Sequence, residues 1–126
     1  MTSNTLLLRQ VHPTFVQDGR ATSQAFVPTE KDANQLSVDD GDQVTPLVSW
    51  ERYTVTFGYK SAGVLAVTPD ECKGLSLPVV PDGVPYPDHC YIDFADLIKK
   101  EAKRKAKLLL SCADVHGWQL QKTQQA

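Results

Sequence analysis

Eight prolines, all within the first 87 residues of the 126-residue chain, divide this part into segments and limit the length of the elements it can form. Proline has no backbone N–H, so it cannot donate to a sheet ladder and it interrupts a helix interior. Pro13 ends a predicted strand over residues 5–12, whereas Pro46 and Pro69 each stand where a helix can begin. Four more prolines stiffen one loop over residues 78–87. The chain therefore favours several short elements within one small domain.

Side-chain patterns predict strands separated by polar turns. The expected strands are residues 5–12, 21–27, 36–38, 61–68 and 89–94. The segment "ATSQAFV" (21–27) alternates in the manner of a strand, and the turn at Asp18-Gly19 should pair it with the first strand. The segment "SAGVLAVT" (61–68) is largely apolar, which indicates burial on both faces.

Two short helices are predicted where a threonine precedes a proline, at Thr45 and at Thr68. In the first helix, Leu47, Trp50 and Tyr53 recur at three-residue spacing and should form its apolar side. Residues 54–57 fit either the end of this helix or a separate strand.

The longest predicted helix runs from residue 96 to residue 116 and ends at Gly117. Its apolar stripe consists of Ile98, Ala102, Ala106, Leu109 and Ala113. Trp118 and Leu120 should fold back onto the body, and residues 121–126 should form a fraying tail. The expected fold class is α+β: one domain over residues 1–126, with a mixed or antiparallel sheet and the C-terminal helix packed on one face.

Composition narrows the functional classes. With 41% hydrophobic and 22% charged residues, the chain is typical of globular proteins. Its apolar runs are too short to span a bilayer, and its first residues do not resemble a secretory leader. Three cysteines without such a leader favour a reducing compartment. These features predict a cytoplasmic protein without a membrane partner.

The stretch "LLLRQVHPTF" raises the first question about a site, because it places Arg9 and His12 at the end of an apolar strand. Alternation puts the two side chains on opposite faces, so a regular strand cannot bring them into one site. Arg9 is expected to form a structural salt bridge, with ligand binding as the alternative. His12 is expected as a capping or surface histidine, and Ser23 as a small packed residue; catalytic roles are the alternatives for both.

The strand "HCYIDF" is a second candidate site, because His89, Tyr91 and Asp93 share one of its faces. A histidine, a phenol and a carboxylate side by side can take part in proton transfer. A solvated polar face is the alternative. If the three residues form a site, His89 should lie exposed or in a cleft beside Arg9 or His12. Paired metal-ligand spacing is missing, so neither a metal nor a cofactor is expected.

Charge is divided unevenly along the chain. Residues 1–98 carry 6 basic and 13 acidic groups, whereas residues 99–126 carry 7 basic and 2 acidic groups. The excess lies in the long helix, and its candidate binding residues are Lys100, Lys103, Arg104 and Lys107. Such a surface attracts an acidic protein partner or a nucleic-acid backbone. A solvated helix face, or one that packs on the acidic body, is the structural alternative.

The segments "LLRQVHP", "GRATSQAF", "SAGVLAVT" and "PDHCYIDF" together resemble a family of small bacterial proteins to which no activity is assigned. A fainter resemblance is to ADP-ribosyltransferase-like proteins, which implies roles for Arg9 or His12 and for Ser23. The leading interpretation is a non-catalytic, partner-binding accessory protein of a bacterial operon or conflict system. The alternative is a small enzyme or nucleotide-binding protein that uses Arg9, Ser23 and the face of His89, Tyr91 and Asp93.

Overall fold

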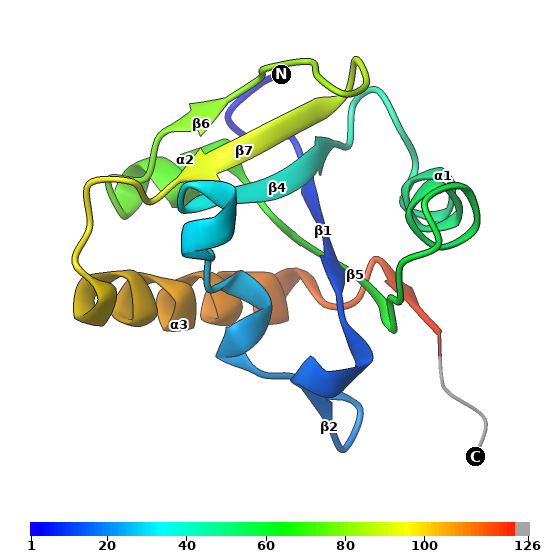
Figure 1. Ribbon diagram of the computed structural model, residues 1–126, viewed down its shortest axis with the longest axis horizontal. Helices are drawn as coiled ribbons and strands as arrows, with labels where there is room; N and C mark the ends of the chain where they lie inside the picture. Colours follow the sequence, from blue (N-terminus) through cyan, green and yellow to red (C-terminus); the bar gives the residue numbers. More distant parts are fainter. Residues whose placement is uncertain (123–126) are drawn as a thin grey trace.

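A six-stranded antiparallel sheet forms the centre of the protein in the computed structural model, which describes residues 1–122 (Figure 1). Its strand order is β6-β7-β4-β1-β5-β8, so the first strand lies in the interior of the sheet. The strands are β1 (Leu7–Val11), β4 (Gln35–Asp40), β5 (Gly63–Val67), β6 (Val79–Val80), β7 (His89–Asp93) and β8 (Leu120–Gln121). A separate two-stranded hairpin pairs β2 (Val16–Gln17) with β3 (Arg20–Ala21).

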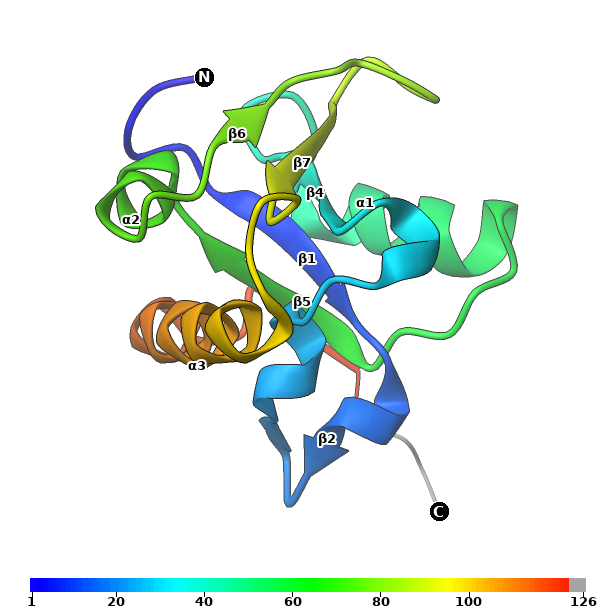
Figure 2. The same cartoon turned by 60° about the vertical axis from the view of Figure 1, so that its left-hand side comes forward.

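Helices cover both faces of this sheet, as Figure 2 shows for α3 and α1. The three α-helices are α1 (Pro46–Glu51), α2 (Pro69–Gly74) and α3 (Lys99–His116). The 3-10 helices are η1 (Pro13–Phe15), η2 (Ser23–Phe26) and η3 (Glu30–Asp32), and η4 (Arg52–Thr56) is a π-helical turn that continues α1. The predicted α+β fold class, with an antiparallel sheet and a long C-terminal helix packed on it, is confirmed.

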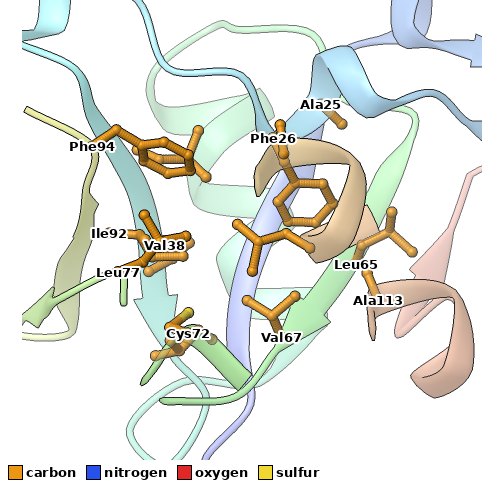
Figure 3. Packing of buried hydrophobic residues seen from close by; sticks show 14 of the residues in the cluster. Ala25, Phe26, Val38, Leu65, Val67, Cys72, Leu77, Ile92, Phe94 and Ala113 are labelled. Carbon is orange, nitrogen blue, oxygen red and sulfur yellow. The ribbon is translucent and has the colours of Figure 1, made fainter. Parts of the chain in front are cut away.

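The main core lies between the sheet and α3 (Figure 3). Leu7 and Val11 of β1 enter it, since alternate side chains of a strand point to the same face. Phe26 of η2 and Leu109 of α3 pack against them and are fully buried. Complete burial of a side chain as large as Phe26 stabilises the fold by about 1.5–3 kcal/mol.

A smaller apolar cluster on the opposite face of the sheet lies under α1. Its buried members are Leu8, Val44, Val64 and Ala66, and Trp50 of α1 packs against them. This explains the apolar character of "SAGVLAVT": all five residues of β5 are buried, because one face meets α3 and the other meets α1.

The helix starts follow the sequence closely. The Thr45 side chain accepts a hydrogen bond from the backbone N–H of Val48 at 3.2 Å and begins α1. Thr68 accepts one from the N–H of Glu71 at 3.1 Å, and Glu71 accepts one from the N–H of Thr68 at 2.8 Å. This reciprocal capping box begins α2, as the threonine–proline pattern predicted.

The predicted strand over residues 21–27 is wrong. Only Arg20–Ala21 pairs as β3, and the chain then forms the 3-10 helix η2. Consecutive residues Ala25 and Phe26 are both fully buried, which a strand with one solvent face does not allow. A helical turn places both side chains in the core, and β1 pairs with β4 and β5 instead of with this segment.

Smaller corrections concern exposure and element ends. Leu47 is 46% exposed and Ile98 is 72% exposed, so neither belongs to the apolar side predicted for its helix. Ile98 precedes the first turn of α3 as its N-cap residue, outside the helical stripe. Gln121 pairs with Gly63, so the chain is ordered beyond the predicted start of the tail. The remainder of the predicted tail, residues 123–126, lies outside the described residues.

Across residues 1–122, no helix combines the length and the apolar character needed to cross a bilayer.

Candidate functional site

An ion-pair cluster of Arg52, Asp39 and Asp88 joins η4, β4 and the segment before β7. Arg52 donates from Nη1 to Asp88 Oδ1 at 3.0 Å and from Nη2 to Asp88 Oδ2 at 2.6 Å. The same Nη2 lies 3.2 Å from Asp39 Oδ2. Both carboxylates are buried, and burial of charge is tolerated where a partner neutralises it and hydrogen-bonds to it.

Uncharged side chains complete this cluster. The Tyr86 hydroxyl donates to Asp39 Oδ1 at 3.0 Å, and the Ser49 hydroxyl donates to Asp39 Oδ2 at 2.6 Å. Tyr86 also covers Arg52, whose guanidinium carbon lies 3.6 Å from the centre of the ring. Ser49 accepts a hydrogen bond from Gln10 of β1, which connects the cluster to the middle of the sheet.

The electrostatics of this cluster favour fixed protonation states. The hydrogen bonds to Asp88 raise the pKa of Arg52, so the guanidinium stays charged. Burial, followed by the negative charge of Asp39 and the hydrogen bond to it, raises the pKa of Tyr86 and keeps its hydroxyl protonated. The charged guanidinium thereby joins η4 to β4 and to the segment before β7.

His89, Tyr91 and Asp93 share one face of β7, as predicted, but they do not form a hydrogen-bonded triad. His89 Nδ1 lies 2.6 Å from Asp82 Oδ1 and its Nε2 lies 3.2 Å from the hydroxyl of Ser37. Asp93 accepts a hydrogen bond from the N–H of Ala95 at 2.8 Å, which turns the chain at the end of β7.

The expectation that His89 lies beside Arg9 or His12 is wrong. The strands that flank β7 are β4 and β6, and β1 lies one strand further away. The connection is indirect: Arg9 donates to the carbonyl oxygen of Ser37, whose hydroxyl meets His89 on the other face of the sheet.

Within residues 1–122, Arg9 pairs with no carboxylate, so the predicted salt bridge is wrong for this part of the chain. Its Nε donates to the carbonyl oxygen of Ala25 at 2.8 Å and its Nη1 donates to that of Ser37 at 3.0 Å. Burial lowers the pKa of the guanidinium. Arg9 thus connects η2 to the sheet through backbone acceptors, which the sequence pattern could not specify.

His12 directly precedes η1, whereas Ser23 is the first residue of η2. His12 Nδ1 accepts a hydrogen bond from the backbone N–H of Thr14 at 3.1 Å and caps η1, in line with the predicted capping role. Ser23 begins η2, the helix whose Ala25 carbonyl receives Arg9. The depression beside Arg9, which Asp32 also lines, measures only about 50 Å³. A water molecule occupies about 30 Å³ of liquid, so this space is far below the size of a nucleotide.

The basic face of α3, defined as Lys100, Lys103, Arg104 and Lys107, is exposed along the outer side of the helix. Arg104 pairs with Glu101 one turn earlier. Within residues 1–122, the three lysines form no ion pair with a carboxylate, so the alternative in which this helix packs its charges on the acidic body is not what the structure contains. Lys105 is the exception among the cations of this stretch, since it is buried.

Groups of metal-ligating residues and surface clefts are two further features that could support chemistry. The described part of the chain contains no group of three or more His, Cys, Asp or Glu residues arranged to hold a metal ion. A cleft of about 380 Å³ lies between residues 27–34 and the start of α3, and its lining includes Glu30, Lys99 and Lys103. None of the residues proposed from the sequence for catalysis lines this cleft.

Comparison with protein-family models, with curated proteins and with solved structures finds no match for this chain. The structure defines an α+β domain, and these comparisons indicate no function for it.

Sequence reasoning missed the cluster of Arg52, Asp39 and Asp88, because its members come from three distant segments. One signal was present. Asp39 directly follows the apolar strand "LSV", and Asp88 directly precedes "HCYIDF". Carboxylates that adjoin buried strands require a cationic partner, and Arg52 is the arginine of the intervening helix.

Proposed function

We propose that the protein is a non-catalytic, cytoplasmic binding protein whose basic face on α3 binds an acidic surface of a protein partner. The observation that carries the proposal is that Lys100, Lys103 and Lys107 lie along one exposed side of α3 and form no ion pair with any carboxylate of residues 1–122. Exposed cations without an internal partner keep their full attraction for an external anion.

A binding role is further supported by the engagement of the groups best suited to chemistry. Arg9 is held by two carbonyl oxygens, and Asp39 and Asp88 are neutralised by Arg52. Burial also raises the pKa of the Cys72 thiol to about 12, which leaves it without nucleophilic thiolate at neutral pH.

A protein partner fits better than nucleic acid because of what surrounds the lysines. The basic face contains no aromatic side chain for base stacking, and the first 98 residues carry a net charge of −7. That charge repels a long phosphate backbone more than it repels a local acidic patch on a protein.

The test is a binding titration at about 50 mM salt, where phosphate and carboxylate contacts are weakly screened. The probes are polyglutamate, duplex DNA and single-stranded RNA. The variant carries Lys100→Gln, Lys103→Gln and Lys107→Gln, and the matched control carries Lys31→Gln, Lys60→Gln and Lys73→Gln. All six lysines are exposed, so both variants lose the same charge from the surface.

Binding of polyglutamate that is lost in the α3 variant and retained in the control supports the proposal. Loss in both variants would show a non-specific effect of net charge and would contradict it. Preferential binding of DNA or RNA that the α3 changes abolish would replace the protein partner with nucleic acid.

A further inference from the structure

The cleft between residues 27–34 and the start of α3 has a largely apolar lining. It lies beside the contact between η2 and α3 (Figure 1). Val27, Pro28 and Leu97 line it and are half-buried, and Ala102 lines it and is buried. Its volume of about 380 Å³ is large enough for one large apolar side chain of a partner or for a small ligand.

The charged side chains of this cleft are available to a ligand. Lys99 and Lys103 line it from α3, and Glu30 lines it from η3. All three side chains are exposed, and none of them forms an ion pair within residues 1–122. Two available cations against one available carboxylate favour an anionic ligand.

Positive charge continues beyond the cleft along α3. Lys99, Lys103 and Lys107 follow one another at four-residue spacing, so they form a row on one side of the helix. We call these three residues the lysine row. It is about 12 Å long, because each residue of an α-helix adds about 1.5 Å.

The length of the lysine row favours a chain segment over a small molecule. Lys107 does not line the cleft, so a ligand confined to the cleft meets only the first two lysines of the row. About four residues of extended chain, at about 3.3 Å each, span the whole row. Alternate side chains of such a chain recur at about 6.6 Å, close to the spacing of about 6 Å between successive lysines.

We propose that the cleft and the lysine row bind a segment of the partner protein in which one large apolar side chain adjoins a run of acidic residues. The apolar side chain enters the cleft beside Leu97, and the carboxylates pair with the lysine row. Glu30 repels the acidic residues nearest the cleft and so limits the affinity. This inference rests on the proposed function, because Lys103 and Lys107 belong to the basic face of α3, and it names the kind of segment that this face recognises.

The experiment is a calorimetric titration of the full chain at about 50 mM salt, where charge contacts are weakly screened. The first probe is a short polyglutamate peptide, and two further probes carry one phenylalanine at either end of it. A polyserine peptide with the same phenylalanine tests the need for acidic residues. N-acetylphenylalanine represents a small molecule, and single-stranded DNA represents nucleic acid.

Two variants alter the cleft, and each has a matched control. Leu97→Ser removes apolar surface from the cleft; its control is Leu75→Ser, because Leu75 is also half-buried against the core but follows α2. Glu30→Gln removes the carboxylate of the cleft; its control is Glu51→Gln, because Glu51 is also exposed but ends α1. Thermal melting shows whether each variant is folded. An increase in affinity for Glu30→Gln cannot result from unfolding.

One of the phenylalanine-bearing acidic peptides should bind about tenfold or more tightly than polyglutamate, because the cleft buries its ring. Leu97→Ser should abolish this gain, and Leu75→Ser should keep it. Glu30→Gln should tighten binding of the same peptide by about two- to fivefold, the effect of one exposed charge, and Glu51→Gln should not.

Equal affinity for polyglutamate and for both phenylalanine-bearing acidic peptides would overturn this inference and leave the proposed function intact. Failure of all three to bind would overturn both. The inference is also overturned if a folded Leu97→Ser keeps the gain, or if Glu30→Gln does not raise the affinity. Equally tight binding of the polyserine peptide or of N-acetylphenylalanine, or a preference for DNA, would show a different ligand and would likewise contradict it.

Discussion

Arg52 and Asp88 form two parallel hydrogen bonds, at 3.0 Å and 2.6 Å, across 36 positions of the chain. This bidentate pair fixes the junction of α1 and η4 to the segment that leads into β7. The position of Tyr86 depends on that connection, because its ring packs directly on the Arg52 guanidinium.

Loss of Arg52 should destabilise the protein strongly. Arg52→Ala leaves Asp39 and Asp88 buried without a cation, and a broken buried pair costs about 3–5 kcal/mol. Arg52→Lys keeps the charge but loses the planar guanidinium, so it should lose less stability than Arg52→Ala. Urea denaturation measures the free energy of unfolding of both variants.

The matched control for this pair is Arg104→Ala. Arg104 is also paired with a carboxylate, Glu101, but that pair is on the surface of α3. Exposed ion pairs contribute little to stability, so Arg104→Ala should leave the urea midpoint of unfolding unchanged. Equal losses for Arg52→Ala and Arg104→Ala would show that the buried pair does not hold the fold.

Stability should fall at alkaline pH. Burial raises the pKa of Cys72 to about 12 and that of Cys90 to about 11, from an ordinary value of 9.0. Below pH 9 the thiols are protonated in both the folded and the unfolded state, so their ionisation does not lower the free energy of unfolding. Above pH 9 the unfolded thiols ionise while the folded ones do not, which favours unfolding until the folded pKa is passed.

Urea denaturation between about pH 8 and pH 10.5 should therefore show a loss on the order of 2 kcal/mol for each of the two thiols. The double variant Cys72→Ala, Cys90→Ala has lower stability at every pH, because it loses packing in the core. Its stability should nevertheless depend less steeply on pH over this window. An unchanged slope would mean that these thiols are not the groups responsible.

The elements with strong local signals could be predicted from the sequence. Threonine–proline pairs located α1 and α2, and the stripe through Ala102, Ala106 and Leu109 located α3. Alternation along β7 correctly separated buried Cys90 and Ile92 from its polar face. In each case the interactions that decide the structure lie within a few residues, where capping and periodicity operate.

The features that the sequence did not predict depend on contacts between distant segments. Residues 21–27 alternate like a strand, but the core required Ala25 and Phe26 together and so selected a helical turn. The sequence predicts a carboxylate partner for Arg9, whereas its guanidinium donates hydrogen bonds to two backbone carbonyl oxygens. The π-helical turn that points Arg52 inward and leaves Phe57 exposed has no signature in the pattern of hydrophobic residues.

Gly63 should not tolerate a side chain. A Cβ at this position would overlap with the carbonyl oxygen of Leu120 on the paired strand β8 and would lie 3.0 Å from the Trp118 ring. Gly63→Ala should therefore lower stability by about 1–3 kcal/mol, because backbone atoms must move to make room.

Gly74→Ala is the control for this change. Gly74 ends α2, has open space around it and does not adopt a positive φ. The substitution should leave stability unchanged or raise it by about 0.4–1 kcal/mol through the unfolded state. Thermal melting of the two variants tests the contrast, and a neutral Gly63→Ala would contradict the close approach of β5 and β8.

The salt dependence of polyglutamate binding tests the central claim most directly, namely that the basic face of α3 binds acidic surfaces. Each carboxylate contact made by Lys100, Lys103 or Lys107 should steepen the loss of affinity as salt rises from about 50 to 200 mM. The protein should therefore lose affinity steeply, whereas the triple glutamine variant of α3 should bind weakly with a flatter slope. The variant with Lys31, Lys60 and Lys73 replaced should keep the steep slope. Identical slopes for the unaltered protein and the α3 variant would contradict the account.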